Sequence, residues 1–446
     1  MASHRLSNPL RFLCLGVAVI SGCATQVTPP PLPTQADVRV GPEIELLAFK
    51  TTYGDLVRAV PDAEGRVHVL IAADELRVVY HVVVEANGVV RRTAVQSDVS
   101  PRSIDAAFDE HGRLHALVGD KHLYLDNATW VQSDPTPWAK AGLEIEQSSL
   151  FSEERGPRFV RGASRLIWAF EVDGGKVGAN WRVDWYDPYT ILPIPWIARG
   201  EKTVLVAESN GAETWTVLER EDKHDTIASC LASDQEGDVY VVYEKRRVIL
   251  QGAGNAFFLR IGAQELIGAE PQAAGSSLHR EGRLLLRSTP AGRDLVFDVV
   301  KAFGGSGWNY EAPLMLAQED CLAVDPGDQN VLLGGRMLFQ SGQWSAASQF
   351  PVFSRRHYRW RASAAGDGRY HGVAIYKYFG PGLFPPLEFQ IVYGRLIGTT
   401  WETAELGHPT REAFDIASFG PEKAFVLWET DKGIVGHWVE IAARKE

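Results

Sequence analysis

Cysteine is scarce in this chain, which has four among 446 residues. The sequence contains no C-x-x-C pair, no H-E-x-x-H segment and no Cys/His cluster of the kind that holds structural zinc. Asp325, Asp328 and Asn330 supply too few ligands for a calcium loop. We therefore expect no metal and no cofactor.

Long apolar runs and helical periodicity are also missing. Residues 12–19 form a short apolar run, whereas a helix that crosses a bilayer needs roughly 20 residues. No uninterrupted helical stripe longer than about ten residues occurs. Short segments rich in Val, Ile, Tyr and Trp recur instead, and these residues suit half-buried strands. The sequence therefore predicts an all-β protein.

Basic residues are outnumbered, since 45 Lys and Arg stand against 56 Asp and Glu, for a formal net charge of −11. Nucleic-acid binding requires a basic face that displaces counterions, and docking on anionic lipid requires a polybasic segment. We expect no nucleic-acid partner, and attachment to a membrane must have another source.

The N-terminus offers that source. Arg5 and Arg11 come before the short apolar run, and Ile20-Ser21-Gly22-Cys23 follows that run. This order is typical of a cleaved export signal. The tetrapeptide resembles the lipobox of bacterial lipoproteins. That resemblance implies cleavage after residue 22 and a lipid on Cys23. An ordinary secretory signal with an incidental cysteine is the alternative.

The residues after Cys23 bear on its destination. Ala24 stands where an aspartate would retain an enterobacterial lipoprotein at the inner membrane. The resemblance therefore implies a lipid anchor in the outer membrane, on either its periplasmic or its surface face. Residues 23–41 are rich in proline and are expected to form an extended tether. Residues 42–446 are expected to form the folded body.

One short phrase repeats along this body. Gly-Arg-x-His occurs at residues 65–68, 112–115 and 368–371. D-x-x-G followed by an apolar strand occurs at residues 62–65, 109–112 and 234–237, with weaker copies at 280–283, 325–327 and 420–422. Asp caps its own backbone in such a turn and Gly accepts a positive φ. Four-stranded units repeating every 40–50 residues or so are typical of a β-propeller. We predict one propeller of antiparallel blades, eight favoured and seven to nine allowed.

The ends of the body are expected to meet in one blade. Residues 414–441 supply about three strands, and residues 43–49 could add the fourth and close the ring. The repeats also resemble those of outer-membrane propeller lipoproteins, including the factor that helps insert outer-membrane barrels, whose blades carry A-x-D-x-x-G. Ala107, Asp109 and Gly112 fit this pattern, and residues 232–237 repeat it. The resemblance implies an envelope protein.

Cys230 and Cys321 are the internal cysteines, and they fall in matching positions of two repeat units. Because we expect matching positions of different units to lie too far apart for a disulfide, we favour two buried thiols. An exported protein could still form the bond.

His68, His115 and His371 recur at one place in the repeat. A catalytic residue is needed once, so this recurrence predicts a structural role for all three.

Residues 176–200 interrupt the repeat and are rich in aromatic residues and proline. Inserted loops often carry binding sites, and Trp and Tyr anchor protein interfaces. Packing of these rings on their own blades is an equal alternative. The candidate binding residues are Trp181, Asp184, Trp185, Tyr186, Tyr189 and Trp196.

A second candidate surface lies in residues 355–379, where cationic and aromatic residues alternate. Arginine forks grip carboxylates and rings stack on sugars, and a His/Tyr pair beside them could serve a polysaccharide lyase as base and acid. The alternative is an amphipathic strand with a solvated basic side. The weaker candidate residues are Arg359, Arg361, His371, Tyr376 and Tyr378.

Two functions remain in view. The favoured one is a non-enzymatic, membrane-anchored envelope lipoprotein whose propeller binds an envelope protein or a glycan. The alternative is a lipid-anchored glycan-active enzyme, either a polysaccharide lyase or a glycoside hydrolase. No carboxylate pair or nucleophile motif stands out from the repeats, which favours binding.

Overall fold

The computed structural model is an all-β protein. It describes residues 38–49, 56–73, 76–97, 103–140, 158–160, 166–172, 179–182, 194–197, 202–208, 212–219, 225–233, 239–253, 256–263, 282–289, 292–298, 322–325, 331–333, 337–340, 343–346, 358–366, 368–379, 387–411 and 413–441. The one helix in these ranges is the single turn α1, Pro137–Lys140. None of the helical structure described is long and apolar enough to cross a membrane.

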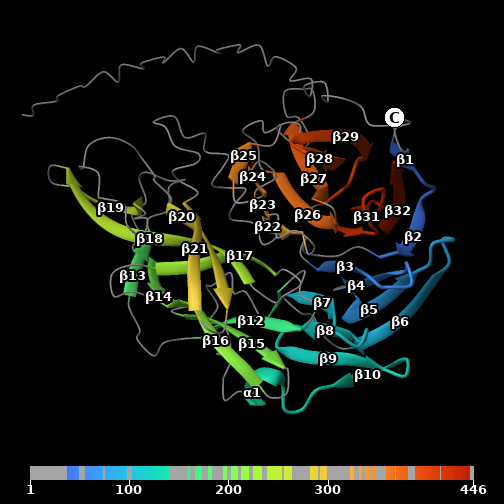
Figure 1. Cartoon of the computed structure of the whole chain (residues 1–446), viewed down its shortest axis with the longest axis horizontal. Helices are drawn as coiled ribbons and strands as arrows, with labels where there is room; N and C mark the ends of the chain where they lie inside the picture. Colours follow the sequence, from blue (N-terminus) through green and yellow to red (C-terminus); the bar gives the residue numbers. More distant parts are fainter. Residues whose placement is uncertain are drawn as a thin grey trace, which may run out of the picture.

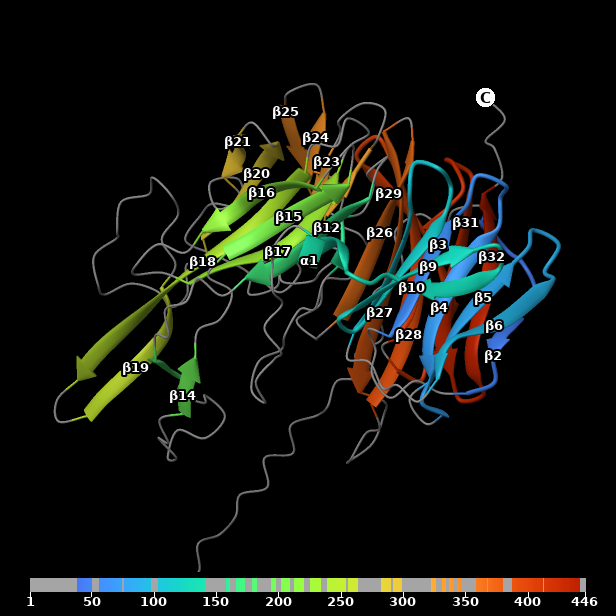
Figure 2. The same cartoon turned by 90° about the horizontal axis from the view of Figure 1, so that it is seen from below.

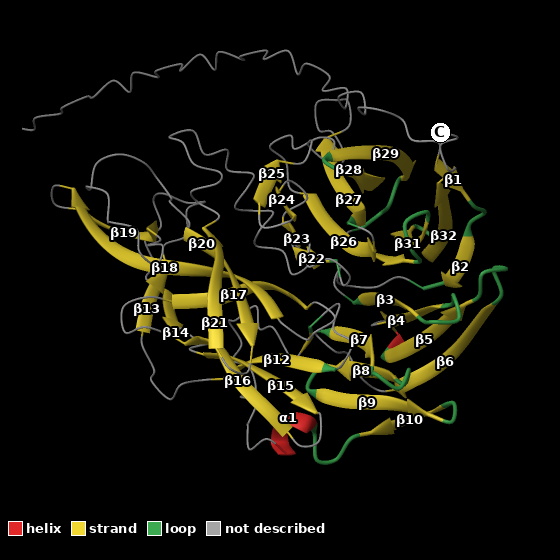
Figure 3. Ribbon diagram, in the orientation of Figure 1, coloured by secondary structure: helices red, strands yellow, loops and turns green. Residues whose placement is uncertain are grey.

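The described strands form seven antiparallel sheets of four or five strands, arranged as blades around a centre (Figures 1 and 3). The first three blades are blade 1 with β3 Val57–Pro61, β4 Val67–Ala73, β5 Val78–Val84 and β6 Val90–Ser97; blade 2 with β7 Ile104–Phe108, β8 Leu114–Val118, β9 Lys121–Asp126 and β10 Thr129–Gln132; and blade 3 with β11 Arg158–Phe159, β12 Ile167–Val172, β15 Lys202–Glu208 and β16 Ala212–Glu219.

The remaining blades follow in chain order. They are blade 4 with β17 Asp225–Ser233, β18 Val239–Ala253, β20 Gly282–Thr289 and β21 Gly292–Asp298; blade 5 with β22 Leu322–Val324, β23 Val331–Leu333, β24 Met337–Gln340 and β25 Gln343–Ala346; blade 6 with β26 Tyr358–Gly366, β27 Arg369–Phe379, β28 Leu387–Ile397 and β29 Thr400–Gly407; and blade 7 with β30 Phe414–Ser418, β31 Lys423–Thr430 and β32 Gly433–Ile441.

The first strand of each blade lines the centre. Strand β3 lies beside β7 and β30, β7 beside β11, β17 beside β22, and β26 beside β22 and β30. Apolar clusters fill the spaces between neighbouring blades. One cluster, for example, joins Leu70 and Val79 of blade 1 to Ile104 and Leu114 of blade 2. Both faces of an inner strand are therefore buried, which explains why β4, β8 and β30 are buried along their whole length.

The two ends of the chain close the ring, as the sequence predicted. Strand β2, Ile44–Leu47, pairs antiparallel with β32 of blade 7. Strand β1, Val38–Val40, pairs with the same strand farther along, so the sheet takes in residues that we had assigned to the tether. The signal and the lipobox lie outside the described residues.

In blades 1 and 2 the D-x-x-G turn lies between the first and second strands. In blade 1 the Asp62 carboxylate accepts hydrogen bonds from the main-chain N–H of Glu64 and Arg66, at 2.9 and 2.8 Å. Gly65 has a φ of 80°, a conformation that favours glycine. Residues 109–112 repeat the geometry in blade 2, whereas residues 234–238 lie outside the described part of the chain.

Within the described residues the strands form seven blades, not the favoured eight. Gly282 resembles the turn of a new unit, but it begins β20, which pairs with β18 as the third strand of blade 4. The 125 positions from Gly112 to Gly237 have room for two or three units at the spacing of the repeat. Among the described residues they hold blade 3 and one two-stranded insertion. Seven blades is the lower end of the predicted range.

Candidate functional site

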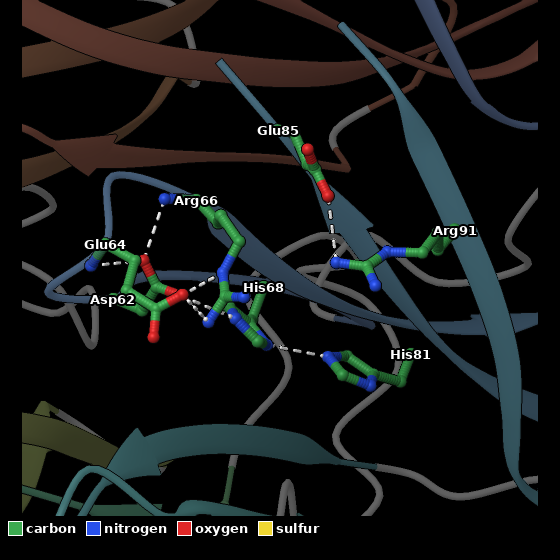
Figure 4. A network of polar contacts seen from close by, with 7 residues as sticks. All are labelled: Asp62, Glu64, Arg66, His68, His81, Glu85 and Arg91. Atoms are coloured by element: carbon green, nitrogen blue, oxygen red, sulfur yellow. Dashed lines mark hydrogen bonds and ion pairs between the residues drawn. The ribbon is translucent and has the colours of Figure 1, made fainter. Parts of the chain in front are cut away.

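The D-x-x-G turn of blade 1 leads into a buried network of one carboxylate and two histidines (Figure 4). The Asp62 Oδ2 atom lies 3.1 Å from His68 Nε2, and His68 Nδ1 lies 2.9 Å from His81 Nε2. Residue Leu70 of β4 pairs with His81 of β5, so His68 and His81 are diagonal neighbours on one face of the sheet. Both histidines are buried.

Blade 2 repeats this network at the same distances. Asp109 Oδ2 lies 3.1 Å from His115 Nε2, and His115 Nδ1 lies 2.9 Å from His122 Nε2. The sequence repeat therefore encodes an Asp–His–His unit. Its second histidine, His81 or His122, was not recognised from the sequence because it falls outside the shared phrase.

Burial favours the neutral form of His68, His81 and His122. It lowers the pKa of His81 to about 3 and that of His122 to about 3, and the preceding histidine of each pair adds to the shift. Burial also lowers the pKa of His68, against the opposing effect of Asp62. With the carboxylate accepting from the Nε2–H of His68, the Nδ1 of that ring is an acceptor, so His81 Nε2–H donates.

The histidines lie where one blade packs on the next. His68 meets Phe108 edge to face, with ring centroids 5.2 Å apart, and His81 meets Trp130 at 5.4 Å. In the following interface His122 meets Trp168 at 5.6 Å. His68 thus packs against blade 2 while its hydrogen bonds stay within blade 1. His115 forms its hydrogen bonds with Asp109 and His122 inside blade 2.

His371 of blade 6 performs the same task with different partners. Its Nδ1 contacts the Tyr393 hydroxyl, and its Nε2–H donates to the Gly420 carbonyl of blade 7 over 2.9 Å. The ring is 0% exposed, and burial lowers its pKa to about 4. Burial also raises the pKa of Tyr393. His371 thus links blades 6 and 7, and its buried ring does not suit contact with a sugar.

Arg361, one arginine of the second candidate surface, does not lie on a solvated strand face. Arg361 of β26 is 4% exposed; its Nη1 lies 3.6 Å from Asp415 Oδ1 of blade 7, and its guanidinium lies over the Phe414 ring. The backbones of Arg359, Tyr376 and Tyr378 lie in β26 and β27, but their side chains are outside the description. The described part of this segment therefore joins blades 6 and 7.

The aromatic insertion forms a sheet of its own. Strand β13, Ala179–Arg182, pairs antiparallel with strand β14, Ile194–Ile197. In the sequence both strands come between β12 and β15 of blade 3. Trp181 pairs with Pro195, and Trp196 with Asn180. Asp184, Trp185, Tyr186 and Tyr189 lie outside the described residues.

A second extension lies against this sheet. In blade 4 the end of β18 leaves the blade and pairs with β19, Ala256–Ala263, and β19 contacts β13. Figure 2 shows β14 and the β18–β19 hairpin extending together, well away from the other blades. The candidate binding segment thus belongs to a protrusion built by two neighbouring blades.

The solved structures that are similar to this chain share little of its sequence. No family model matches the chain, and no curated protein does. Among solved structures it is similar to a protein of unknown function from Dyadobacter fermentans, with 10% identity, a TM-score of 0.41 and coverage of 91% of this chain and 100% of that one. The chain is also similar to a polysaccharide lyase of the ulvan lyase type, with 8% identity, a TM-score of 0.42 and coverage of 91% of this chain and 95% of that one. A third similar structure is BBS1N in complex with ARL6, with 8% identity, a TM-score of 0.40 and coverage of 92% of this chain and 98% of that one. We take no functional residue from these structures.

Proposed function

We propose that this protein is a lipid-anchored lipoprotein of the outer membrane whose propeller is a rigid support for binding, and whose protrusion recognises an envelope protein or a glycan. One observation carries the proposal: the aromatic insertion folds into a separate sheet outside the seven blades. The titratable groups of the described blades support it further. His68, His81, His115, His122 and His371 are buried within or between the blades.

The register of the insertion suggests how it binds. Residues paired directly across two strands share a face. Trp181 therefore shares a face with Pro195 and with the Ala179–Ile197 pair, whereas Trp196 lies on the opposite face. A two-stranded sheet is at best marginally stable alone, so we expect one face to be covered by the neighbouring hairpin and the other to meet the partner.

The anchor is tested by replacing Cys23 with serine. We expect Cys23→Ser to abolish lipidation, because the thiol is the acceptor of the diacylglyceryl group, and to release the protein from the membrane fraction. Metabolic labelling with radioactive palmitate measures the first effect and fractionation the second. Palmitate label that persists in the variant would show that the lipobox interpretation is wrong.

The protrusion is tested by replacing Trp181, Trp185 and Trp196 singly with alanine. A tryptophan that anchors an interface costs about 2 kcal/mol or more when truncated, roughly a thirtyfold loss of affinity. The readouts are the yield of cross-linked envelope complexes for a protein partner and co-sedimentation with purified sacculi for a glycan. Melting temperatures should stay near the wild-type value for at least one tryptophan. If all three melt many degrees lower, the rings are packing residues, each worth about 3–5 kcal/mol.

The structure offers a matched control for this series. Val172 and Lys202 are direct partners in blade 3, so an Asn-Gly turn replacing residues 173–201 would close the hairpin without disturbing the register. We expect this variant to keep the blades and lose binding.

A further inference from the structure

The N-terminal strand shows at which face of the propeller the chain enters the fold. Val38 of β1 pairs with Ile441, the last residue of β32. The main-chain N–H of Ile441 also donates a hydrogen bond of 2.9 Å to the carbonyl of Glu422. Glu422 lies in the turn between the first and second strands of blade 7, β30 and β31. The chain therefore enters at the face on which the first strand of this blade ends.

The first turns of the neighbouring blades lie on the same face. His371, near the first turn of blade 6, donates to the carbonyl of Gly420 in the first turn of blade 7. Gly368, in the first turn of blade 6, donates its main-chain N–H to Asp325 Oδ2 at the end of the first strand of blade 5. Blades repeat radially around a propeller, so their first strands end on one side. We call this side the turn face.

The aromatic insertion leaves blade 3 from the opposite face. Strand β12 begins at Ile167, beside the first turn, where the Ile167 carbonyl accepts a hydrogen bond of 2.9 Å from the main-chain N–H of Val160. The strand ends at Val172, which pairs with Lys202 at the start of β15. Strands β13 and β14 lie between these two residues in the sequence. The insertion therefore departs a full strand length away from the turn face.

The second extension leaves blade 4 from that opposite face too. Strand β18 begins at Val239, which pairs with Ser233 at the end of β17, and its Arg246 pairs with Asp225 at the start of β17. Beyond that point the partner of β18 is β19. Strand β19 contacts β13, and Figure 2 shows β14 and the β18–β19 hairpin extending in one direction. The protrusion thus lies opposite the turn face.

We propose that the turn face is directed toward the membrane and that the protrusion points away from it, so that the partner of the protrusion lies in the aqueous compartment. The proposal rests on the lipid anchor at Cys23 of the proposed function. The opposite orientation would require residues 24–37 to run back along β32, nine residues or about 30 Å, before they reach the bilayer. That detour is more than half of their greatest reach, about 50 Å. The face at which the chain enters is therefore the one that the anchor holds nearest to the lipid.

Charged side chains on the turn face form ion pairs with one another. Arg91 Nη2 lies 2.9 Å from Glu85 Oε1 in blade 1, and Lys423 Nζ lies 3.6 Å from Glu440 Oε1 in blade 7. Attraction to anionic lipid requires a surplus of basic residues, which such pairs do not supply. The point of chain entry, rather than charge, then sets the orientation, so the orientation should not depend on salt.

Blade 1 offers a matched pair of positions for a test. Val89, 49% exposed, lies between β5 and β6 on the turn face, and Leu76, 36% exposed, lies between β4 and β5 on the opposite face. Strand β5, with seven residues, separates them by about 20 Å. A genetically encoded fluorescent amino acid replaces one or the other in the full-length lipidated protein. The protein is bound to vesicles of phosphatidylethanolamine and phosphatidylglycerol that carry a quencher on their headgroups. We expect a greater loss of fluorescence at position 89 than at position 76, at low and at high salt.

The outcomes separate the orientation from the anchor. An equal loss at the two positions, or a greater loss at position 76, from protein that floats with the vesicles would overturn the orientation. Wild-type protein that does not float with the vesicles would instead contradict the lipid anchor. The Cys23→Ser protein, which we expect not to float, gives the fluorescence of the unbound probe at each position. The two proposals therefore fail with different results.

Discussion

Acidification from pH 7 to pH 5 is expected to remove about 6 kcal/mol from the free energy of unfolding. His81 and His122 have folded-state pKa values of about 3, and His371 has one of about 4, against 6.5 in the unfolded chain. At a pH between the folded-state and unfolded-state pKa values, these histidines are protonated in the unfolded chain and neutral in the folded protein. The free energy of unfolding therefore falls as the pH falls. Each histidine then costs about 2 kcal/mol at pH 5.

Urea denaturation at pH 7, 6 and 5 measures this loss. His81→Gln keeps a donor for His68 but does not titrate, so its unfolding should take up about one proton fewer over this range. His111 has a side chain that is 75% exposed, and His111→Gln should behave as wild type. A His81→Gln protein that keeps the wild-type pH dependence would mean that the buried pair is not neutral.

Asp415→Ala is expected to destabilise the protein by about 3–5 kcal/mol, because it leaves a buried guanidinium without its carboxylate. The Asp415 side chain is 0% exposed; it meets Arg361 of blade 6 and accepts from Ala59 N of blade 1. One residue thus links blade 7 to both of its neighbours. The loss should appear as a lower midpoint of urea unfolding.

Two further variants separate the charge from general disruption. Asp431 lies on an exposed turn between β31 and β32, and Asp431→Ala should change stability by less than about 0.5 kcal/mol. Replacing both members of the buried pair, as in Arg361→Met with Asp415→Leu, should recover part of the loss, since no buried charge is left unpaired. A double variant less stable than Asp415→Ala would show that the aspartate acts mainly through the Ala59 main chain.

The elements of a blade could be predicted because their pattern is local. Strands β7 and β8 flank a D-x-x-G turn, which is a matter of Asp and Gly chemistry. The recurrence of His68, His115 and His371 predicted a structural role, and all three side chains are buried. The closing strand was predictable from an unpaired apolar segment at residues 43–49.

The relations between blades could not be predicted in the same way. The sequence pattern of β20 resembles the start of a unit, and only the pairing of Gly282 with Lys245 shows that it continues blade 4. Arg361 looked like a solvated residue by strand alternation, but both faces of an inner strand are covered by neighbouring blades. The contact between Arg58 of blade 1 and Asp105 of blade 2 could not be predicted either, because it joins residues of two different repeat units.

The central claim is that the propeller is the support and the protrusion is the contact surface. Site-specific photo-cross-linking in intact cells tests it most directly, with the cross-linker placed at position 181 or 196 and, as a control, at Val89, which is 49% exposed on blade 1. We predict a discrete adduct from one of the two insertion positions and none from Val89. Adducts from Val89 with none from positions 181 and 196 would contradict the account.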